Sequence, residues 1–336
     1  MSKERLSGLS RRSFLKVATG VAAAGAGITI PGGARAAGDK RLATLIDLSL
    51  CDGCPDREVP ACVSVCKEIN RDKIPRIAEP IPVPWPRKKV EDWSKKREVF
   101  DRLTPYNFIY VHRAEVEEGG RKKTVFVPRR CMHCDHPACA TICPFSANHK
   151  YENGAVVIDQ DLCFGGAKCK AVCPWEIPQR QSGVGIYLHI LPNLAGNGVM
   201  YKCDLCQERL TAGKLPGCIE ACPRQAMLIG PRKQIYALAE ERAKAMQGYI
   251  YGKKENGGTA TLYVSPVSFA ALNGTMKRQP GRPDMKAEER RMAETDKMGK
   301  AVLQAPLYGI AAGVAGAFLS LSRRKDRRKG GATDHE

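Results

Sequence analysis

The chain has 336 residues, enough to bury the core of one large or two small domains without covalent cross-links. Its 15 cysteines are an odd number, and its 6 histidines are few, which argues against a disulfide framework and against mixed Cys/His zinc sites. The net charge of +19 lies partly in basic runs such as residues 86–89 and 121–123. We interpret these runs as solvated faces and do not predict nucleic-acid binding.

Residues 1–36 have the features of a twin-arginine export signal. Arg11 and Arg12 are followed by Phe-Leu-Lys, then by an Ala/Gly-rich apolar stretch at 17–30 and a small-residue cleavage site at 34–36. This route carries proteins that fold, often around metal centres, before export. We therefore expect the body of the chain to face the periplasm, where its cysteines need not form disulfides.

Short apolar, β-branched stretches precede or run up to the cysteine groups. We expect them to be strands that feed ligand loops: residues 42–50, 108–112, 124–127 and 156–158. The Glu-Gly-Gly sequence at 118–120 predicts a hairpin turn. The proline-rich stretch 79–86 predicts an extended insertion on the surface, and the apolar spacing in 233–247 predicts a helix.

The cysteines fall into four groups, and each group ends in the same C-x3-C step. The groups are Cys51, Cys54, Cys62 and Cys66; Cys131, Cys134, Cys139 and Cys143; Cys163, Cys169 and Cys173; and Cys203, Cys206, Cys218 and Cys222. Proline follows the last cysteine of three groups, at Pro144, Pro174 and Pro223. This pattern is typical of ferredoxins, in which the cysteine before proline ligates the cluster of the other motif. Zinc bound to C-x2-C pairs is the alternative, and it would make the chain a structural zinc protein.

The end of the chain predicts a membrane anchor. Residues 301–322 are 22 residues without charge, long enough for one transmembrane helix. A buried or interfacial helix is the alternative, because Gln304 and Pro306 interrupt the apolar run. The basic tail 323–336 favours a cytoplasmic end, and the polar stretch 277–300 is expected to be a linker.

Three sequences carry a resemblance to a known family: CMHCDHPACATICP at 131–144, CDLCQERLTAGKLPGCIEACP at 203–223 and YGKKENGGTATLYVS at 251–265. From the first motif to about residue 270, the chain resembles the four-cluster ferredoxin-like electron-transfer subunits of bacterial membrane oxidoreductases. With the single C-terminal span, it looks most like the hydrogenase-2 electron-transfer subunit, and formate dehydrogenase β subunits come next.

The resemblance implies how the cysteines are shared, because in this family the first motif pairs with the fourth and the second with the third. It implies the sets Cys51, Cys54, Cys62 and Cys222; Cys203, Cys206, Cys218 and Cys66; Cys131, Cys134, Cys139 and Cys173; and the remainder Cys163, Cys169 and Cys143. The first motif departs from the family pattern, with five extra residues between Pro55 and Ala61.

The remaining set has three ligands, because the third motif, CFGGAKCKAVCP, has Gly166 where the family usually has cysteine. Nitrate reductase β subunits lose the corresponding cysteine and hold a [3Fe–4S] centre. We therefore expect three [4Fe–4S] clusters and one [3Fe–4S] cluster. A fourth iron held by water or by Asp161, and a vacant site, are the alternatives.

Three further residues lie beside the expected ligands. His133 and His136 are within the second motif, where they would either tune its cluster, relay protons or lie in its surroundings as surface groups. Trp175 follows Cys173-Pro174, and both a place between clusters and a buried packing role are open to it.

We expect an α+β body at residues 37–276, made of two interleaved ferredoxin-like (2×[4Fe–4S]) units with insertions, and a C-terminal transmembrane helix. A radical-type cysteine triad and a strand-linked G-x-G-x-x-G are missing from the sequence. We therefore expect a non-catalytic subunit that relays electrons between an exported, hydrogenase-like catalytic subunit and a multi-span quinone-reactive membrane subunit, with its own helix in the lipid. The same role in a formate dehydrogenase or another molybdenum or tungsten oxidoreductase is the alternative.

Overall fold

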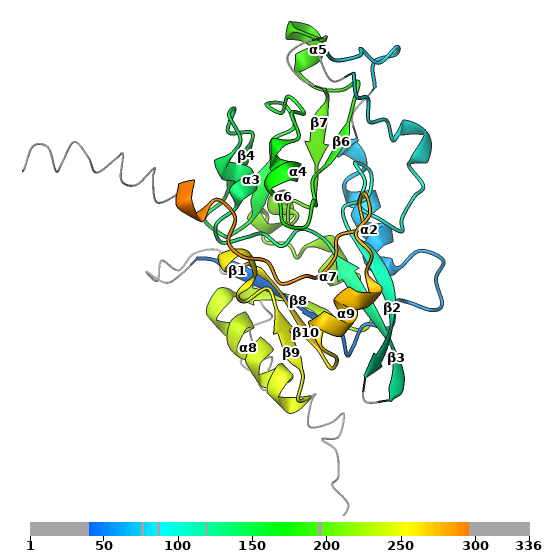
Figure 1. Cartoon of the computed structure of the whole chain (residues 1–336), viewed down its shortest axis with the longest axis vertical. Helices are drawn as coiled ribbons and strands as arrows, with labels where there is room; N and C mark the ends of the chain where they lie inside the picture. The colour runs from blue at the N-terminus through cyan, green and yellow to red at the C-terminus, as the bar shows by residue number, and fades with distance from the viewer. Residues whose placement is uncertain (1–39, 75–76, 86–87, 119, 194–196, 296–336) are drawn as a thin grey trace, which may run out of the picture. The chain divides into compact units, whose positions relative to one another are not determined.

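The structure, a computed structural model, describes residues 40–74, 77–85, 88–118, 120–193 and 197–295 (Figure 1). The chain divides into two compact units, residues 1–289 and 290–336. The expected signal peptide at 1–36, the transmembrane helix at 301–322 and the basic tail at 323–336 lie outside the described residues. Within the described ranges, no helix has the length and apolar character needed to cross a bilayer.

A four-stranded sheet joins the two ends of the first unit. Its strand order is β8-β1-β10-β9, with β8 at Met227–Pro231, β1 at Leu42–Asp47, β10 at Thr261–Ser265 and β9 at Tyr249–Tyr251. β1 runs parallel to β10 and antiparallel to β8, so that Thr44 lies between Thr261 and Ile229. The first cysteine motif, which follows β1, therefore begins beside the segment that leads from the fourth motif into β8.

The strand predicted at 42–50 ends three residues early, at Asp47. The Asp47 carboxylate accepts hydrogen bonds from the backbone N–H of Ser49 at 3.0 Å and from its hydroxyl at 2.6 Å. Such a local turn competes with the strand ladder. The chain consequently leaves the sheet before Cys51 and enters the first ligand loop.

Helix α8 (Arg232–Ala245) packs on the sheet, as Figure 1 shows. It confirms the helix predicted at 233–247, beginning one residue earlier and ending two residues earlier. Its buried side chains meet those of β1 and β10 in a hydrophobic cluster: Ala43, Leu45, Ile235, Ala239, Ala243, Leu262 and Val264. This layer is held by apolar burial.

The described residues also contain three antiparallel strand pairs. β2 (Tyr110–Glu118) pairs with β3 (Arg121–Arg129), β4 (Asn148–Lys150) with β5 (Val156–Ile158), and β6 (Gln179–Gln181) with β7 (Val199–Tyr201). The strand predicted at 156–158 is confirmed, and the strand predicted at 124–127 lies within β3. The strand predicted at 108–112 overlaps β2, which begins two residues later, at Tyr110. β3 ends two residues before Cys131 and β7 two residues before Cys203, so each delivers the chain into a cysteine motif.

Short helices carry five of the cysteines. They are α2 (Ala61–Ile69), α3 (Ala138–Thr141), α4 (Lys168–Val172) and α7 (Gly217–Glu220), and α6 (Gln207–Thr211) begins directly after Cys206. α2 packs against α7, and α3 packs against α4. The other helical segments are α5 (Tyr187–Ile190), α9 (Phe269–Thr275) and the 3-10 turns η1 (Arg71–Lys73), η2 (Ser94–Lys96) and η3 (Glu255–Gly257).

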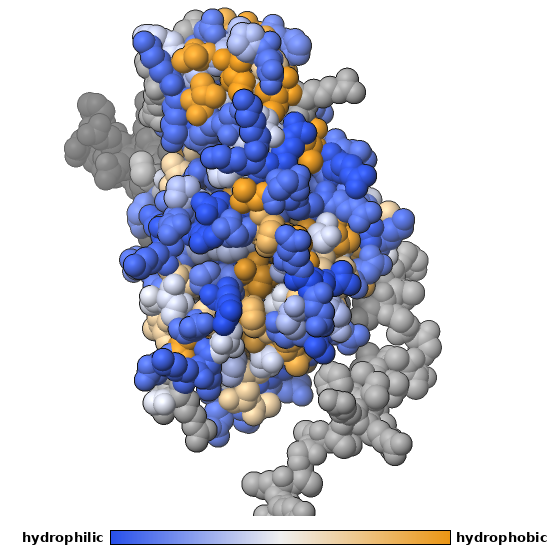
Figure 2. Space-filling model, turned by 90° about the vertical axis from the view of Figure 1, so that its right-hand side faces the viewer, coloured by the Kyte–Doolittle hydropathy of each residue, from blue (hydrophilic) through white to orange (hydrophobic). Residues whose placement is uncertain are grey.

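Residues 79–85 of the insertion predicted at 79–86 are extended at the end of the first unit that carries α5, and Pro86 lies outside the described residues. The backbone here bonds to the loops around that helix: Ala78 N–H, just before the insertion, donates to Gly183 O at 2.8 Å, and Trp85 N–H donates to Asn193 O at 2.7 Å. Figure 2 shows apolar side chains gathered at this end. Val83, Trp85, Ile190 and Leu191 are among the exposed large apolar residues there.

Candidate iron–sulfur cluster sites

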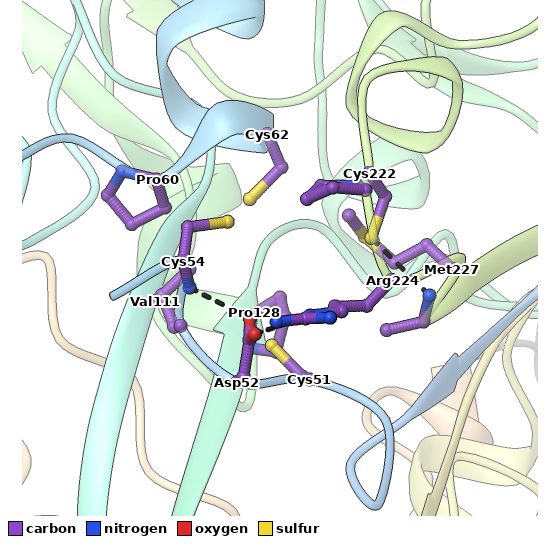
Figure 3. Close-up of a pocket in the computed structure, with 13 residues that line it drawn as sticks. Cys51, Asp52, Cys54, Pro60, Cys62, Val111, Pro128, Cys222, Arg224 and Met227 are labelled. Carbon is purple, nitrogen blue, oxygen red and sulfur yellow. Dashed lines mark hydrogen bonds and ion pairs between the residues drawn. The ribbon is translucent and has the colours of Figure 1, made fainter. Parts of the chain in front are cut away.

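The first site is a pocket lined by Cys51, Cys54, Cys62 and Cys222, with an empty volume of about 340 Å³ that includes open solvent. Cys51 and Cys54 come from the loop after β1, Cys62 from α2, and Cys222 from the turn after α7. Figure 3 shows their sulfurs turned toward a common space. The structure thus brings three cysteines of the first motif together with the last cysteine of the fourth.

Burial is the main electrostatic influence on this pocket. It raises the pKa of the Cys51 thiol to about 11, opposed by the Gly53 backbone N–H and assisted by the Cys222 and Cys54 sulfurs. At neutral pH such a thiol stays protonated, and positive charge placed beside it, as iron would supply, favours its thiolate form. At the rim of the pocket, Arg224 forms an ion pair with Asp52, whose carboxylate accepts the Cys54 N–H at 3.0 Å.

Gly53 fixes the path of the first loop. Its φ is +73°, and a Cβ atom there would lie 2.3 Å from the Phe126 ring of β3. A residue with a side chain would meet both the left-handed backbone conformation and this ring. Glycine therefore lets the C-x2-C loop lie flat against the β2–β3 hairpin.

The second site is lined by Cys66, Cys203, Cys206 and Cys218, with an empty volume of about 330 Å³. It reverses the exchange of the first site, since three cysteines come from the fourth motif and one from the first. α2 carries both Cys62 and Cys66, one for each pocket. Packing of α2 against α7 is close, because a Cβ on Gly217 would lie 2.2 Å from Ile69 Cδ1.

The predicted third set draws its cysteines from the second and third motifs. Burial raises the pKa of the Cys134 thiol well above its ordinary value, and the nearby Cys139, Cys131 and Cys173 sulfurs raise it further. Burial likewise raises the pKa of Cys173 to about 12, with Cys139 as the strongest neighbouring charge. Cys134 and Cys173 therefore both lie close enough to Cys131 and Cys139 for charge on one sulfur to affect the other.

The remaining cysteines have a different environment. Cys163 Sγ accepts the backbone N–H groups of Met200 at 3.4 Å and Gly165 at 3.5 Å, and Cys143 is among the charges that raise its pKa. Burial raises the pKa of the Cys169 thiol, and the sulfurs of Cys139, Cys163 and Cys173 raise it further. Cys169 therefore lies near cysteines of both the third and the fourth predicted sets. Gly166 offers no ligand, and a Cβ built on it would meet no heavy atom within 4 Å. Asp161 is exposed.

Buried polar groups around these thiols fit iron–sulfur clusters. The Asn148 side chain is 3 % exposed and lies beside Cys139. Neither its amide nitrogen nor its oxygen has a hydrogen-bond partner within the part of the chain that the structure describes. Over the same residues, no three His, Cys, Asp or Glu side chains converge tightly enough to hold a single metal ion.

Two buried cations lie near the thiols of the second and fourth motifs. Arg130 and Lys202 directly precede the first cysteines of the second and fourth motifs, and both are almost fully enclosed. Although burial alone would lower the pKa of Arg130, the Cys203 and Cys218 sulfurs raise it. Lys202 is held in its charged form in the same way, by Cys131, Cys139 and Cys203. Positive charge is thus placed where thiolates and clusters would bring negative charge.

The structure separates the two histidines of the second motif. His136 is exposed, whereas His133 is buried and lies against Cys203 of the fourth motif, with its Nε2 3.6 Å from the sulfur. Trp175 is buried, and its indole N–H donates to the Tyr251 hydroxyl at 2.7 Å. This contact gives Trp175 the packing role that its position left open.

Sequence reasoning missed a repeated feature of the ligand loops. Pro60, Pro137 and Pro216 each precede a short helix, and in each case the cysteine is the second residue of that helix. The signal was the tripeptide Pro-Ala-Cys or Pro-Gly-Cys, which occurs in three of the four motifs. Proline is suited to this position because its fixed φ guides the chain into a helix.

Comparison with known proteins supports a cluster-binding body. Two family models, each described as a 4Fe-4S dicluster domain, match residues 50–147 and 122–232. The chain is 31 % identical over 310 residues to the hydrogenase-2 operon protein HybA of Escherichia coli O157:H7, which covers 79 % of this chain and 83 % of that protein.

Two further relatives are similar. The iron-sulfur subunit of the nitrate-inducible formate dehydrogenase of Escherichia coli K12 is 31 % identical over 235 residues, 66 % of this chain and 67 % of that subunit. A protein of Nitratidesulfovibrio vulgaris Hildenborough is 32 % identical over 231 residues, 68 % of this chain. The match spans only 55 % of the length of that protein.

Proposed function

The chain belongs to the family of iron–sulfur electron-transfer subunits of bacterial oxidoreductase complexes, and on this premise we propose that it relays electrons through three [4Fe–4S] clusters and one [3Fe–4S] cluster. The observation that carries the proposal is the pair of pockets in which the first and fourth motifs exchange their last cysteines. Such exchange is the ferredoxin arrangement for two neighbouring clusters.

The proposed ligand sets are those that family resemblance implies. Cys51, Cys54, Cys62 and Cys222 would hold one [4Fe–4S] cluster; Cys66, Cys203, Cys206 and Cys218 a second; Cys131, Cys134, Cys139 and Cys173 a third; and Cys163, Cys169 and Cys143 the [3Fe–4S] cluster. When bound, the clusters supply one-electron redox chemistry. The chain's own residues would position the thiols of each set, exclude water from them and place the buried cations Arg130 and Lys202 beside them.

Contacts between the motifs support one order for the four sites. The first site, with Cys51, and the second site, with Cys66 and Cys203, share α2. His133 of the second motif contacts Cys203, and Cys169 interacts electrostatically with both Cys139 and Cys163. A relay would therefore run from the first site through the second site to the cluster held by Cys131, and from there to the cluster held by Cys163. Its direction depends on the partners at the two ends.

The partner proposal follows from the relatives. The chain spans 83 % of the hydrogenase-2 operon protein, which favours a hydrogenase-like catalytic subunit on the periplasmic side of the inner membrane. A formate dehydrogenase or another molybdenum or tungsten enzyme is the second candidate, favoured by the match to the formate dehydrogenase subunit. In either complex the chain would be non-catalytic and would exchange electrons with a quinone-reactive membrane subunit.

The same proposal assigns the parts of the chain. Residues 1–36 would be the twin-arginine signal peptide, 301–322 a transmembrane helix in the lipid, and 323–336 a basic cytoplasmic tail. The four-cluster body, predicted to end at residue 276, would extend to residue 289, because the first compact unit reaches that residue and Met285 is buried. The linker predicted at 277–300 would then begin at residue 290. Truncation before Ala301 tests the anchor, since the shortened chain should leave the membrane fraction. Its retention there without a partner subunit would contradict the anchor.

The electron-transfer proposal is tested with the intact complex purified from the membrane without oxygen. Hydrogen or formate is added separately, and low-temperature EPR follows the cluster signals of this chain. We expect one of the two donors to reduce the clusters, and a quinone analogue to reoxidise them. Clusters that respond to neither donor nor quinone, in a complex that still turns over, would contradict the proposal.

A further inference from the structure

The sulfur of Cys203 receives an unusual set of donors. Leu205 donates its backbone N–H at 3.4 Å, as expected in a C-x2-C loop. The guanidinium of Arg130 lies 3.9 Å away through Nη1, and the imidazole of His133 lies 3.6 Å away through Nε2. Both side chains come from the second motif or the residue before it, whereas Cys203 belongs to the fourth.

The hydrogen bonds of His133 fix which ring nitrogen carries the proton. The backbone N–H of Val156 donates to His133 Nδ1 at 3.0 Å, so Nδ1 must present a lone pair. A neutral imidazole then carries its hydrogen on Nε2, the atom that faces Cys203. The ring is 0 % exposed, and β5 therefore aims a fixed N–H dipole at this sulfur.

The sulfurs of Cys222 and Cys163, which belong to other sites, receive hydrogen bonds from backbone donors. Cys222 accepts the backbone N–H of Ala226 at 3.3 Å, and Cys163 accepts two further backbone N–H groups. The site that contains Cys203 adds side chains to such backbone donors, since the Asn70 amide also lies 3.5 Å from Cys66 Sγ. The conformation of the loop fixes the backbone donors, but a side-chain donor can be gained or lost by a single substitution.

We propose that His133 sets the reduction potential of the neighbouring site by acting through Cys203: its Nε2–H bond to the sulfur favours the reduced form of the cluster that Cys66, Cys203, Cys206 and Cys218 hold. The reduced form carries one more negative charge, and a hydrogen bond to a ligand sulfur stabilises that charge. His133 is thus a positioning residue of the second motif that acts on the cluster of the other half. The inference rests on the proposed four-cluster relay.

Two substitutions separate the sulfur contact from the packing. In His133→Asn, the side-chain oxygen replaces Nδ1 as acceptor for Val156, but the shorter side chain does not reach Cys203. Asparagine also suits the left-handed backbone here, where φ is +48°. In His133→Gln, the amide nitrogen takes the place of Nε2 and restores a donor. His136→Asn, in the exposed histidine of the same motif, is the matched control.

The measurement is an EPR-monitored redox titration of the full chain in its complex. We expect His133→Asn to lower one midpoint potential, so that the reduced-to-oxidised ratio at a fixed ambient potential falls about tenfold, or about 59 mV for one electron. His133→Gln and His136→Asn should leave that midpoint near the wild-type value. All three variants should keep the wild-type iron content.

Two results would overturn the inference and leave the relay intact: an unchanged set of four midpoints in His133→Asn, or the same shift in His133→Asn and His133→Gln. A measurement on the wild-type protein guards against a variant that does not assemble. With histidine labelled with 15N, pulsed EPR should detect a weak nitrogen coupling on one cluster signal, and its absence would contradict the inference. A wild-type chain without clusters would instead refute the proposed function.

Discussion

The sheet with α8 and the cysteine loops are stabilised in different ways. The sheet layer buries Ala43, Leu45, Leu262 and Val264 at 0 % exposure against α8, with regular strand pairing on both sides of β1. The cysteine loops contain only short helices of four or five residues outside α2, and all their cysteines are buried or half-buried. One region is therefore held by apolar packing, whereas the other depends on what its thiols bind.

Removing one cysteine of the second site should have the largest effect. Cys218→Ala would leave three thiols there, as in the set of Cys163, Cys169 and Cys143, so we expect at most a [3Fe–4S] cluster at that site and the loss of at least one of about 15 irons. Because α7 and α2 pack on one another around this pocket, both should become exposed to proteolysis. Iron analysis and limited proteolysis measure the two effects. Full iron content in the variant would show that Cys218 is not a ligand.

A cavity between the sheet and α8 should lower local stability without changing the iron content. Leu45→Ala removes a fully buried side chain between β1 and α8, which should cost about 2–5 kcal/mol of local stability. Hydrogen exchange at the β10 amides measures this loss, and the iron content should not change. Glu241→Ala, at an exposed position of α8, is the control and should stay within about 0.5 kcal/mol of the wild type. Loss of iron in Leu45→Ala would mean that the two regions are not independent.

A cysteine at position 166 should complete the three-ligand site. A Cβ at Gly166 meets no heavy atom within 4 Å, so Gly166→Cys should fit, raise the iron content by about one, and replace the [3Fe–4S] EPR signal with a [4Fe–4S] signal. Gly165→Cys is the matched comparison, because its Cβ would lie 2.4 Å from Gly198 O and its φ is +65°. Disruption by Gly166→Cys as severe as that by Gly165→Cys would contradict the open site.

The smallest effect is expected at Trp175. Trp175→Phe removes the indole N–H bond to the Tyr251 hydroxyl, which still donates to Lys286 O at 2.7 Å. The loss should be about 0.5–1.5 kcal/mol, seen as a modest decrease in the thermal unfolding temperature. Rates of electron transfer through the complex should stay at the wild-type value. A large decrease in those rates, at full iron content, would place Trp175 on the electron path.

The sequence predicted the sheet layer and the ligand loops with different success. The apolar spacing of residues 233–247 sufficed for α8, because a helix on a sheet needs only one buried face. The pairing of β1 with β8 and β10 joins segments about two hundred residues apart and could not be predicted from local pattern. The early end of β1 depended on the turn formed by Asp47, which the apolar run through Leu50 concealed.

The cysteine sites show the same division. Motif spacing identified all 15 cysteines as ligand candidates, but family resemblance, not spacing, supplied their grouping. The contact of His133 with Cys203 was beyond sequence reasoning, because it joins two motifs 70 residues apart and depends on the Val156 amide of β5. Arg130 and Lys202 were visible in the sequence as basic residues before cysteines. Only the structure shows that both are buried and that their charges lie near thiols.

The presence of four clusters in this chain is tested most directly by the content of iron and acid-labile sulfide, measured together with EPR on the intact, anaerobically purified protein. The ligand sets predict about 15 irons per chain and a [3Fe–4S] signal in the oxidised protein. Little iron, or zinc in its place, would contradict the relay and leave the zinc-binding structural protein as the reading of these cysteines.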